Sequence, residues 1–293
     1  MRLSAPDFLL RETLECGQAF RWRPSADGGY YGYIAQAAVK VSQAGKQLTA
    51  ETADPRLTEA DVRHYFALDL DLPRVLASVD VDAQIHDAIG RFAGLRIVRQ
   101  ESWECLASFV LSSFNNIKRI QGMIERLCQA YGHPVSFNGF RGCSFPSAEV
   151  VASASERRLR QLGFGYRAPY LLDTARMVAE GRIPLEALRQ AEYRAAKASL
   201  MHCPGVGEKV ADCVALFGLE KYDAFPVDLW MERAMRYYFR QRRVTPMRMR
   251  EFAETHFGQY AGYAQQYLYH YVRTARVVPK PGDRALERVP AAA

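Results

Sequence analysis

The feature that most constrains the fold is a helix-breaking turn, CPGVG at 203–207, between two segments that can each be helical. The segment before the turn is ALRQAEYRAAKASL. In the segment after it, EKVADCVALFGL, four apolar residues recur at helical spacing: Val210, Cys213, Val214 and Phe217. Pro204, Gly205 and Gly207 form helix poorly, and the glycines allow another molecule to approach the backbone closely. The sequence therefore predicts a helix-hairpin-helix over 187–219.

The turn opens directly into the second helix, so unpaired N–H groups and the positive end of the helix dipole would face outward. That arrangement suits a phosphate. A nucleotide-binding P-loop is not indicated, because no strand pattern precedes the turn and Gly-x-x-x-x-Gly-Lys-Ser/Thr is absent. We expect a nucleic-acid backbone as the ligand of Gly205 and Gly207.

Lys209 and Asp228 are the candidate catalytic pair. Lys209 lies in the first turn of the second helix, where the dipole disfavours a cation. Desolvation there would favour the neutral amine, which is a nucleophile. Beside a phosphate site, such an amine could capture a sugar carbon while the carboxylate of Asp228 stabilises oxocarbenium-like charge, which fits cleavage of an N-glycosidic bond. Taken alone, Lys209 would be interpreted as a solvated lysine and Asp228 as a helix N-cap. Together with the hairpin, the pair favours a catalytic interpretation.

Composition adds limits on partners and cofactors. The net charge of +7 and pI of about 9.1 suit a polyanion. Seven arginines and no acidic residue occur from Arg233 to Arg250, which leaves open a phosphate-facing stripe or a solvated face. The six Cys and six His show no metal-ligand spacing, so we expect no metal and no cofactor.

The sequence also limits the compartment. It has no apolar run of about 18 residues, and its start lacks a secretory signal. We expect no membrane association and an intracellular protein that works where the DNA is: the cytoplasm or nucleoid of a bacterium, or the nucleus of a eukaryote.

The patterning divides the chain into two parts. Residues 1–99 show short alternating segments separated by glycine turns, such as SADGG at 25–29, with helical stretches near 58–67 and 82–93. From about 102 the apolar period becomes helical, with a break at Phe114-Asn115-Asn116. We expect an α+β fold in which an antiparallel β-rich N-terminal domain (1–99) packs on a mostly α-helical body (100–278), with a DNA cleft between them and a mobile tail at 279–293.

CPGVGEKVADC followed by FPVD resembles the helix-hairpin-helix and Gly/Pro-Asp signature of base-excision DNA glycosylases, and in detail the 8-oxoguanine DNA glycosylase family. Four further segments match in order: ECGQAFRW at 15–22, SSFNNIKRIQGMIERLCQAYG at 112–132, LGFGYRAPY at 162–170 and YAGYAQQYLY at 260–269. Many DNA-binding modules share the hairpin, whereas the set of five is highly specific. The resemblance implies a bifunctional glycosylase/AP lyase that flips out 8-oxoguanine and excises it through a Schiff base on Lys209.

The resemblance assigns four residues to base recognition. The carbonyl of Gly17 would accept the N7 hydrogen that 8-oxoguanine has and guanine lacks, and Gln265 would read the Watson–Crick edge. Cys213 and Tyr269 would sandwich the base. Tyr269 stands where the family has Phe, so its hydroxyl has no assigned role. Without the family, Gly17 would be read as a turn glycine and the ring of Tyr269 as part of the core.

The resemblance assigns DNA contacts to seven further residues: Phe114, Asn115, Asn116, Arg119, Tyr166, Arg167 and Trp230. Tyr166 would be a wedge beside the flipped base and Arg167 a contact to the orphaned partner. Phe114 replaces an Asn of the family and cannot hydrogen-bond a base edge, which predicts weak preference for cytosine opposite the lesion. Trp230 stands where the family commonly has a histidine. Its indole N–H can still donate one hydrogen bond, but it carries no charge.

Two alternatives stay open. One is a non-catalytic helix-hairpin-helix module that grips phosphate. The other is a glycosylase for a different, alkylated base, although such an activity would not need Lys209. For the main hypothesis the partner is double-stranded DNA containing an oxidised purine, bound by a monomer.

Overall fold

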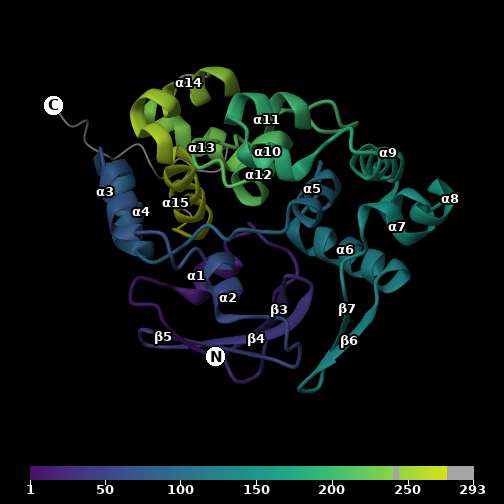
Figure 1. The fold of residues 1–293 in the computed structure, drawn as a ribbon. Helices are drawn as coiled ribbons and strands as arrows, with labels where there is room; N and C mark the ends of the chain where they lie inside the picture. Colours follow the sequence, from purple (N-terminus) through teal and green to yellow (C-terminus); the bar gives the residue numbers. More distant parts are fainter. Residues whose placement is uncertain (240–243, 276–293) are drawn as a thin grey trace.

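The computed structural model describes residues 1–239 and 244–275 of the chain (Figure 1). The N-terminal part contains a five-stranded antiparallel sheet with the strand order β1-β5-β4-β3-β2. Its strands are β1 (Arg2–Ser4), β2 (Arg23–Pro24), β3 (Tyr30–Ile34), β4 (Ala37–Ala44) and β5 (Gln47–Thr52). The predicted tail at 279–293 lies outside the described residues.

Tight turns give the sheet its register. Ala35 and Gln36 join β3 to β4 with φ values of 46° and 68°, which is the two-residue turn that matches strand twist. One face of the sheet is apolar and packs on α1 (Leu10–Glu15) and α2 (Glu59–Tyr65). Figure 1 shows these two helices between the sheet and the helical body.

The strands end at Thr52, so only the first half of the predicted β-rich region is sheet. The helices predicted near 58–67 and 82–93 are confirmed as α2 and α4 (Ala83–Phe92). Between them lies a helix that was not predicted, α3 (Leu72–Val79). Its signal is the Asp71 side chain, which accepts from the N–H of Arg74, followed by a proline in the first turn.

The second part is mainly helical, which confirms the predicted α+β class. It contains α5 (Ser102–Leu111), α6 (Ile117–Tyr131), α7 (Ala148–Ala152), α8 (Glu156–Leu159), the π-helical turn η1 (Arg160–Phe164), α9 (Arg167–Ala179), α10 (Leu185–Gln190), α11 (Tyr193–Leu200), α12 (Glu208–Gly218), α13 (Leu229–Tyr238), α14 (Pro246–Phe257), η2 (Gly258–Tyr260) and α15 (Ala261–Ala275). Among the described residues, no helix is long and apolar enough to cross a membrane.

Two helices organise the body. α5 is buried on nearly all sides and packs against α9 and α12. α15 packs against α3, α4 and α13, and the hydroxyl of Tyr267 donates to the carbonyl of Leu95 at 2.8 Å. The last described helix therefore lies against the segment that links the sheet to the body (Figure 1).

The helix predicted over 187–200 is two helices, α10 and α11, separated by Ala191 and Glu192 in extended conformations. In a continuous helix the carbonyl of Arg189 would accept from the N–H of residue 193. Here the ammonium group of Lys221 donates to that carbonyl instead, and the Arg189 guanidinium pairs with Glu220 at 2.7 Å. These tertiary contacts outweigh local helix propensity.

A second small sheet, β6 (Pro134–Phe137) and β7 (Phe140–Cys143), was not predicted. Its turn is Asn138-Gly139, with φ values of 46° and 80°, and Asn-Gly is a strong hairpin signal. The ring of Phe140 stacks on Tyr31 of β3, with centroids 5.0 Å apart. The hairpin thus extends the contact between the two parts of the protein.

Candidate active site

The hairpin between α11 and α12 uses its two glycines differently. Gly205 has φ +77°, and a Cβ there would come within 2.5 Å of the Tyr170 ring, so this position requires glycine. Gly207 is an extended residue that precedes α12 and provides no side-chain cap. A Cβ on Gly207 would meet no atom within 4 Å. No side chain caps the first N–H groups of α12, and the backbone at Gly207 is open to close approach, so a phosphate could bind there.

α12 carries Lys209 one turn before Cys213. Lys209 is half-buried, and its Nζ lies 5.4 Å from the ring centroid of the buried Phe109. Burial raises the pKa of the Cys213 thiol to about 11; the neighbouring Lys209 opposes this rise and Asp228 adds to it. Lys209, Cys213 and Asp228 therefore lie within electrostatic range of one another.

Asp228 caps α13. Its Oδ1 accepts from the N–H groups of Trp230 and Met231, each at 2.9 Å. The sequence left a helix N-cap and a catalytic carboxylate as alternatives, and the geometry makes them compatible. The two backbone donors fix the orientation of the carboxylate beside Lys209 and Cys213.

α15 presents Gln265 and Tyr269 on one face. Gln265 is only 4% exposed, and its Oε1 has no hydrogen-bond partner among the described residues. A buried acceptor left unpaired costs about 1–3 kcal/mol, so this oxygen is suited to a donor on a ligand. Burial raises the pKa of Tyr269 to about 12, with Asp228 adding to the rise, so the carboxylate of Asp228 lies within electrostatic range of this ring.

Gly17 lies beside Tyr269. It has φ +90°, and a Cβ there would lie 3.6 Å from the Tyr269 hydroxyl and 2.9 Å from Nη1 of Arg273. Arg273 is a neighbour of the site that sequence reasoning missed. Its signal was spacing, because it follows Gln265 and Tyr269 at i+8 and i+4 on one helix face.

The loop after α5 carries three of the predicted DNA-contact residues, Phe114, Asn115 and Asn116. Phe114 is 98% exposed and has φ +46°, an unusual combination for an aromatic residue. The amide of Asn115 donates to the carbonyl of Leu111, and Asn116 caps α6 by accepting from the N–H of Arg119. The two asparagine side chains thus serve the protein itself, while the Phe114 and Arg119 side chains face solvent.

Tyr166 and Arg167 support the same loop. Arg167 is 3% exposed, and its guanidinium donates to the carbonyls of Ser113 and Phe114. It was predicted to contact the orphaned base, and in this structure it holds the Phe114 backbone. Tyr166 is half-exposed and donates to the same Ser113 carbonyl at 3.1 Å. Phe114 and Tyr166 are therefore two exposed aromatic rings on adjoining loops.

Two described arginines of the arginine-rich segment make different contacts. Arg233 lies over the indole of Trp230, with its guanidinium carbon 4.9 Å from the ring centroid. Arg250 is largely buried and pairs with Glu208 and with the fully buried Asp212 on α12. These ion pairs connect Arg250 to α12, the helix that carries Lys209. The arginines at 240, 242 and 243 lie outside the described residues.

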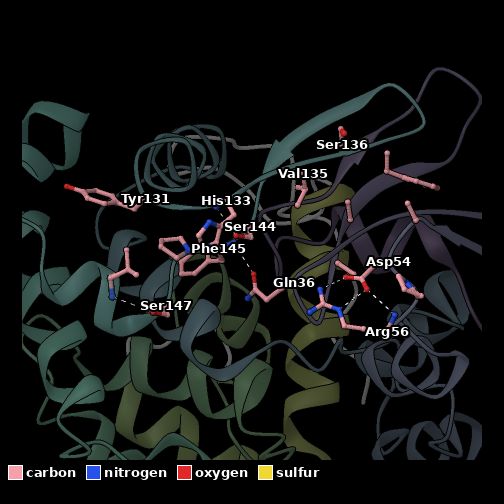
Figure 2. A pocket seen from close by; sticks show the side chains of 17 residues that line it. Gln36, Asp54, Arg56, Tyr131, His133, Val135, Ser136, Ser144, Phe145 and Ser147 are labelled. Atoms are coloured by element: carbon pink, nitrogen blue, oxygen red, sulfur yellow. Dashed lines mark hydrogen bonds and ion pairs between the residues drawn. The ribbon is translucent and has the colours of Figure 1, made fainter.

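A cavity of about 690 Å³ lies between the N-terminal sheet and the β6–β7 hairpin (Figure 2). Gln36, His133 and Arg56 are among its lining residues, and Arg56 is paired with Asp54 at 2.7 Å. None of the predicted site residues lines this cavity. Within the part of the chain that the structure describes, no group of three or more His, Cys, Asp or Glu could hold a metal ion.

Known proteins resemble the chain over nearly its whole length. Residues 1–106 match the 8-oxoguanine DNA glycosylase N-terminal domain, and residues 107–259 match the HhH-GPD superfamily of base excision DNA repair proteins. The N-glycosylase/DNA lyase OGG1 of Arabidopsis thaliana is 30% identical over 286 residues, which cover 92% of this chain and 78% of the relative. The N-glycosylase/DNA lyase of Saccharomyces cerevisiae is 32% identical over 262 residues, covering 80% of this chain and 69% of the relative.

A solved structure agrees with these sequence matches. It is that of Clostridium acetobutylicum 8-oxoguanine glycosylase/lyase in complex with double-stranded DNA containing cytosine opposite 8-oxoguanine, with a TM-score of 0.89 and 30% identity. The likeness covers 93% of this chain and 94% of that one. The chain therefore belongs to the 8-oxoguanine DNA glycosylase family, within the helix-hairpin-helix Gly/Pro-Asp superfamily.

Proposed function

We propose that this protein is a bifunctional DNA glycosylase/AP lyase that flips 8-oxoguanine out of duplex DNA and excises it in base-excision repair. Family membership over nearly the whole chain supports the activity. The observation that supports it locally is that Lys209 and Asp228 both act electrostatically on Cys213, that Asp228 also acts on Tyr269, and that one turn before Tyr269 the buried Gln265 keeps an unpaired oxygen. The protein acts as a monomer on the DNA of the cell.

Duplex binding combines charge and shape. The net charge of +7 draws the protein to DNA, and the open N–H groups at the start of α12 receive a backbone phosphate. Phe114 and Tyr166 enter the base stack where the nucleotide leaves it. Filling that void offsets the unstacking cost of a few kcal/mol.

The flipped base is read by two groups from distant parts of the chain. The carbonyl of Gly17 accepts the N7 hydrogen of 8-oxoguanine, whereas guanine would place a lone pair there and leave two acceptors unpaired. Gln265 pairs with the Watson–Crick edge. Cys213 and Tyr269 hold the two faces of the ring.

The chemistry follows from Lys209 and Asp228. The lone pair of the Lys209 amine forms a bond to C1′ while the C1′–N9 bond breaks. The electron pair of the C1′–N9 bond leaves with the base, which takes up a proton as the lysine nitrogen loses one. Asp228 stabilises the positive charge that develops on the sugar. Opening of the sugar ring then gives an imine between Lys209 and C1′, and β-elimination of the 3′ phosphate cleaves the strand.

Base release from a duplex containing 8-oxoguanine opposite cytosine tests this function. The wild type should release 8-oxoguanine, Lys209→Gln should not, and Lys46→Gln should match the wild type because Lys46 is an exposed turn residue. Tight binding of the same duplex without base release by the wild type would instead support a non-catalytic DNA-binding module. Release of alkylated purines with no release of 8-oxoguanine would identify a different glycosylase.

A further inference from the structure

Arg273 joins the two sides of the base site. On α15 it lies one turn beyond Tyr269, with its guanidinium carbon 5.4 Å from that ring centroid. Its Nη2 donates to the carbonyl of Glu15, and its Nη1 lies 2.9 Å from the position that a Cβ on Gly17 would occupy. The Arg273 side chain therefore lies against Tyr269 of α15, against the end of α1 and against Gly17.

The end of α1 leads directly into Gly17. Glu15 is the last residue of α1, and the final carbonyls of a helix have no partner within the helix. A cation that binds there is also favoured by the helix dipole. The chain turns at Gly17, two residues after the carbonyl that Arg273 binds.

α15 holds α1 at a second point. Nε2 of the buried His270 lies 2.6 Å from Oε2 of Glu12. The Glu15 carboxylate also accepts from the Tyr30 hydroxyl of β3 at 2.7 Å. α1 is thus fixed on its sheet side by Tyr30 and on its α15 side by His270 and Arg273, and of these three residues Arg273 is the one that reaches Gly17.

We infer that Arg273 is a positioning residue for damaged-base recognition: it fixes the Gly17 carbonyl relative to the Tyr269 ring and thereby sets the discrimination between 8-oxoguanine and guanine. The inference rests on the proposed function. In the proposed function a single carbonyl, that of Gly17, distinguishes the two bases. A hydrogen bond weakens steeply as its donor–H–acceptor angle departs from linearity, so the discrimination depends on how this carbonyl is oriented. A misplacement of about 1 Å can cost about 100-fold in rate.

The test compares Arg273→Met and Arg273→Lys with Arg11→Met. Arg11 is a matched control because it pairs with the Glu15 carboxylate at 3.3 Å, while its own side chain is 77% exposed. Three quantities are measured for each folded variant: single-turnover excision of 8-oxoguanine opposite cytosine, strand cleavage at a preformed abasic site, and affinity for a duplex containing a tetrahydrofuran abasic analogue.

Arg273→Met should slow base excision about 10- to 100-fold, with cleavage at the abasic site and affinity for the analogue within about twofold of wild type. Arg273→Lys should restore part of the excision rate, because an ammonium can still donate to the Glu15 carbonyl. Arg11→Met should match the wild type. In a Lys209→Gln background, Arg273→Met should also lower the ratio of affinities for 8-oxoguanine and guanine duplexes.

Two results overturn the inference alone: excision by Arg273→Met at the wild-type rate, or an equal loss of excision and abasic-site cleavage, which would mark a general structural role. If Arg273→Met does not fold, as judged by thermal melting, Arg273→Lys takes its place in every measurement. The inference then predicts that Arg273→Lys excises more slowly than the wild type with unchanged abasic-site cleavage, and that it lowers the affinity ratio in the Lys209→Gln background. A wild-type protein that releases no 8-oxoguanine would instead defeat the proposed function and this inference together.

Discussion

A Cβ on Gly17 would lie 3.6 Å from the hydroxyl of Tyr269, although the two residues come from opposite ends of the chain. The proposed base site therefore forms only when α1 has packed on α15. This packing is specific, because Arg273 binds the carbonyl of Glu15 and His270 binds Glu12. In the proposed function, folding and recognition of the base therefore depend on the same contacts.

Gly17→Ala should abolish most excision. Its Cβ would meet Nη1 of Arg273 at 2.9 Å and Ile117 at 3.2 Å, and a non-glycine residue at φ +90° is strained by about 1–3 kcal/mol. We expect excision of 8-oxoguanine to fall about 100-fold in single-turnover assays. Gly28→Ala is the control, since Gly28 has φ +83° and no neighbouring atom within 4 Å. Equal excision by the two variants would contradict the role of Gly17.

Asp228→Asn separates the charge of this residue from its N-cap role. An amide oxygen can still accept from the N–H groups of Trp230 and Met231, so the free energy of unfolding should change by less than about 0.5 kcal/mol. Loss of the charge should lower excision about 100- to 1000-fold. Urea unfolding and single-turnover excision measure the two effects. A large stability loss with little loss of rate would reverse the assignment.

Phe114 predicts weak discrimination among the bases opposite the lesion. Its ring is exposed and can fill a void, but it offers no hydrogen bond. Phe114→Asn should raise the preference for cytosine about tenfold, and asparagine tolerates the φ of +46°. Excision opposite each of the four bases measures the effect. A wild-type enzyme active only opposite cytosine would refute it.

His270 makes stability depend on pH. Burial lowers its pKa below the ordinary value of 6.5, against the opposing effect of Glu12. The charge of Arg273 lowers this pKa further, and the charge of Glu15 raises it. As the pH falls below about 6.5, His270 takes up a proton in the unfolded chain but stays neutral in the folded protein. The free energy of unfolding therefore decreases as the pH falls. From pH 7.5 to about pH 5.5, the free energy of unfolding of the wild type, measured by urea unfolding, should fall by more than that of His270→Gln. Parallel pH profiles would rule out this contribution.

Much of the fold and of the candidate site could be predicted from the sequence. The hairpin before α12, the α+β division and the family follow from motifs that are continuous in the chain. The break between α10 and α11 could not be predicted, because Lys221, which binds the carbonyl of Arg189 left free at the break, comes from a later segment. The same holds for Arg273, whose importance depends on Gly17 at the other end of the chain, and for Phe114, whose backbone Arg167 holds.

The central claim is that the amine of Lys209 becomes covalently joined to the sugar. Sodium borohydride reduces an imine to a stable amine, so it should trap the wild-type protein on a duplex containing 8-oxoguanine. Peptide mass mapping should then place the adduct on Lys209, and Lys209→Gln should give none. Active wild-type enzyme that releases the base yet never becomes trapped, or an adduct mapped to another residue, would contradict the account.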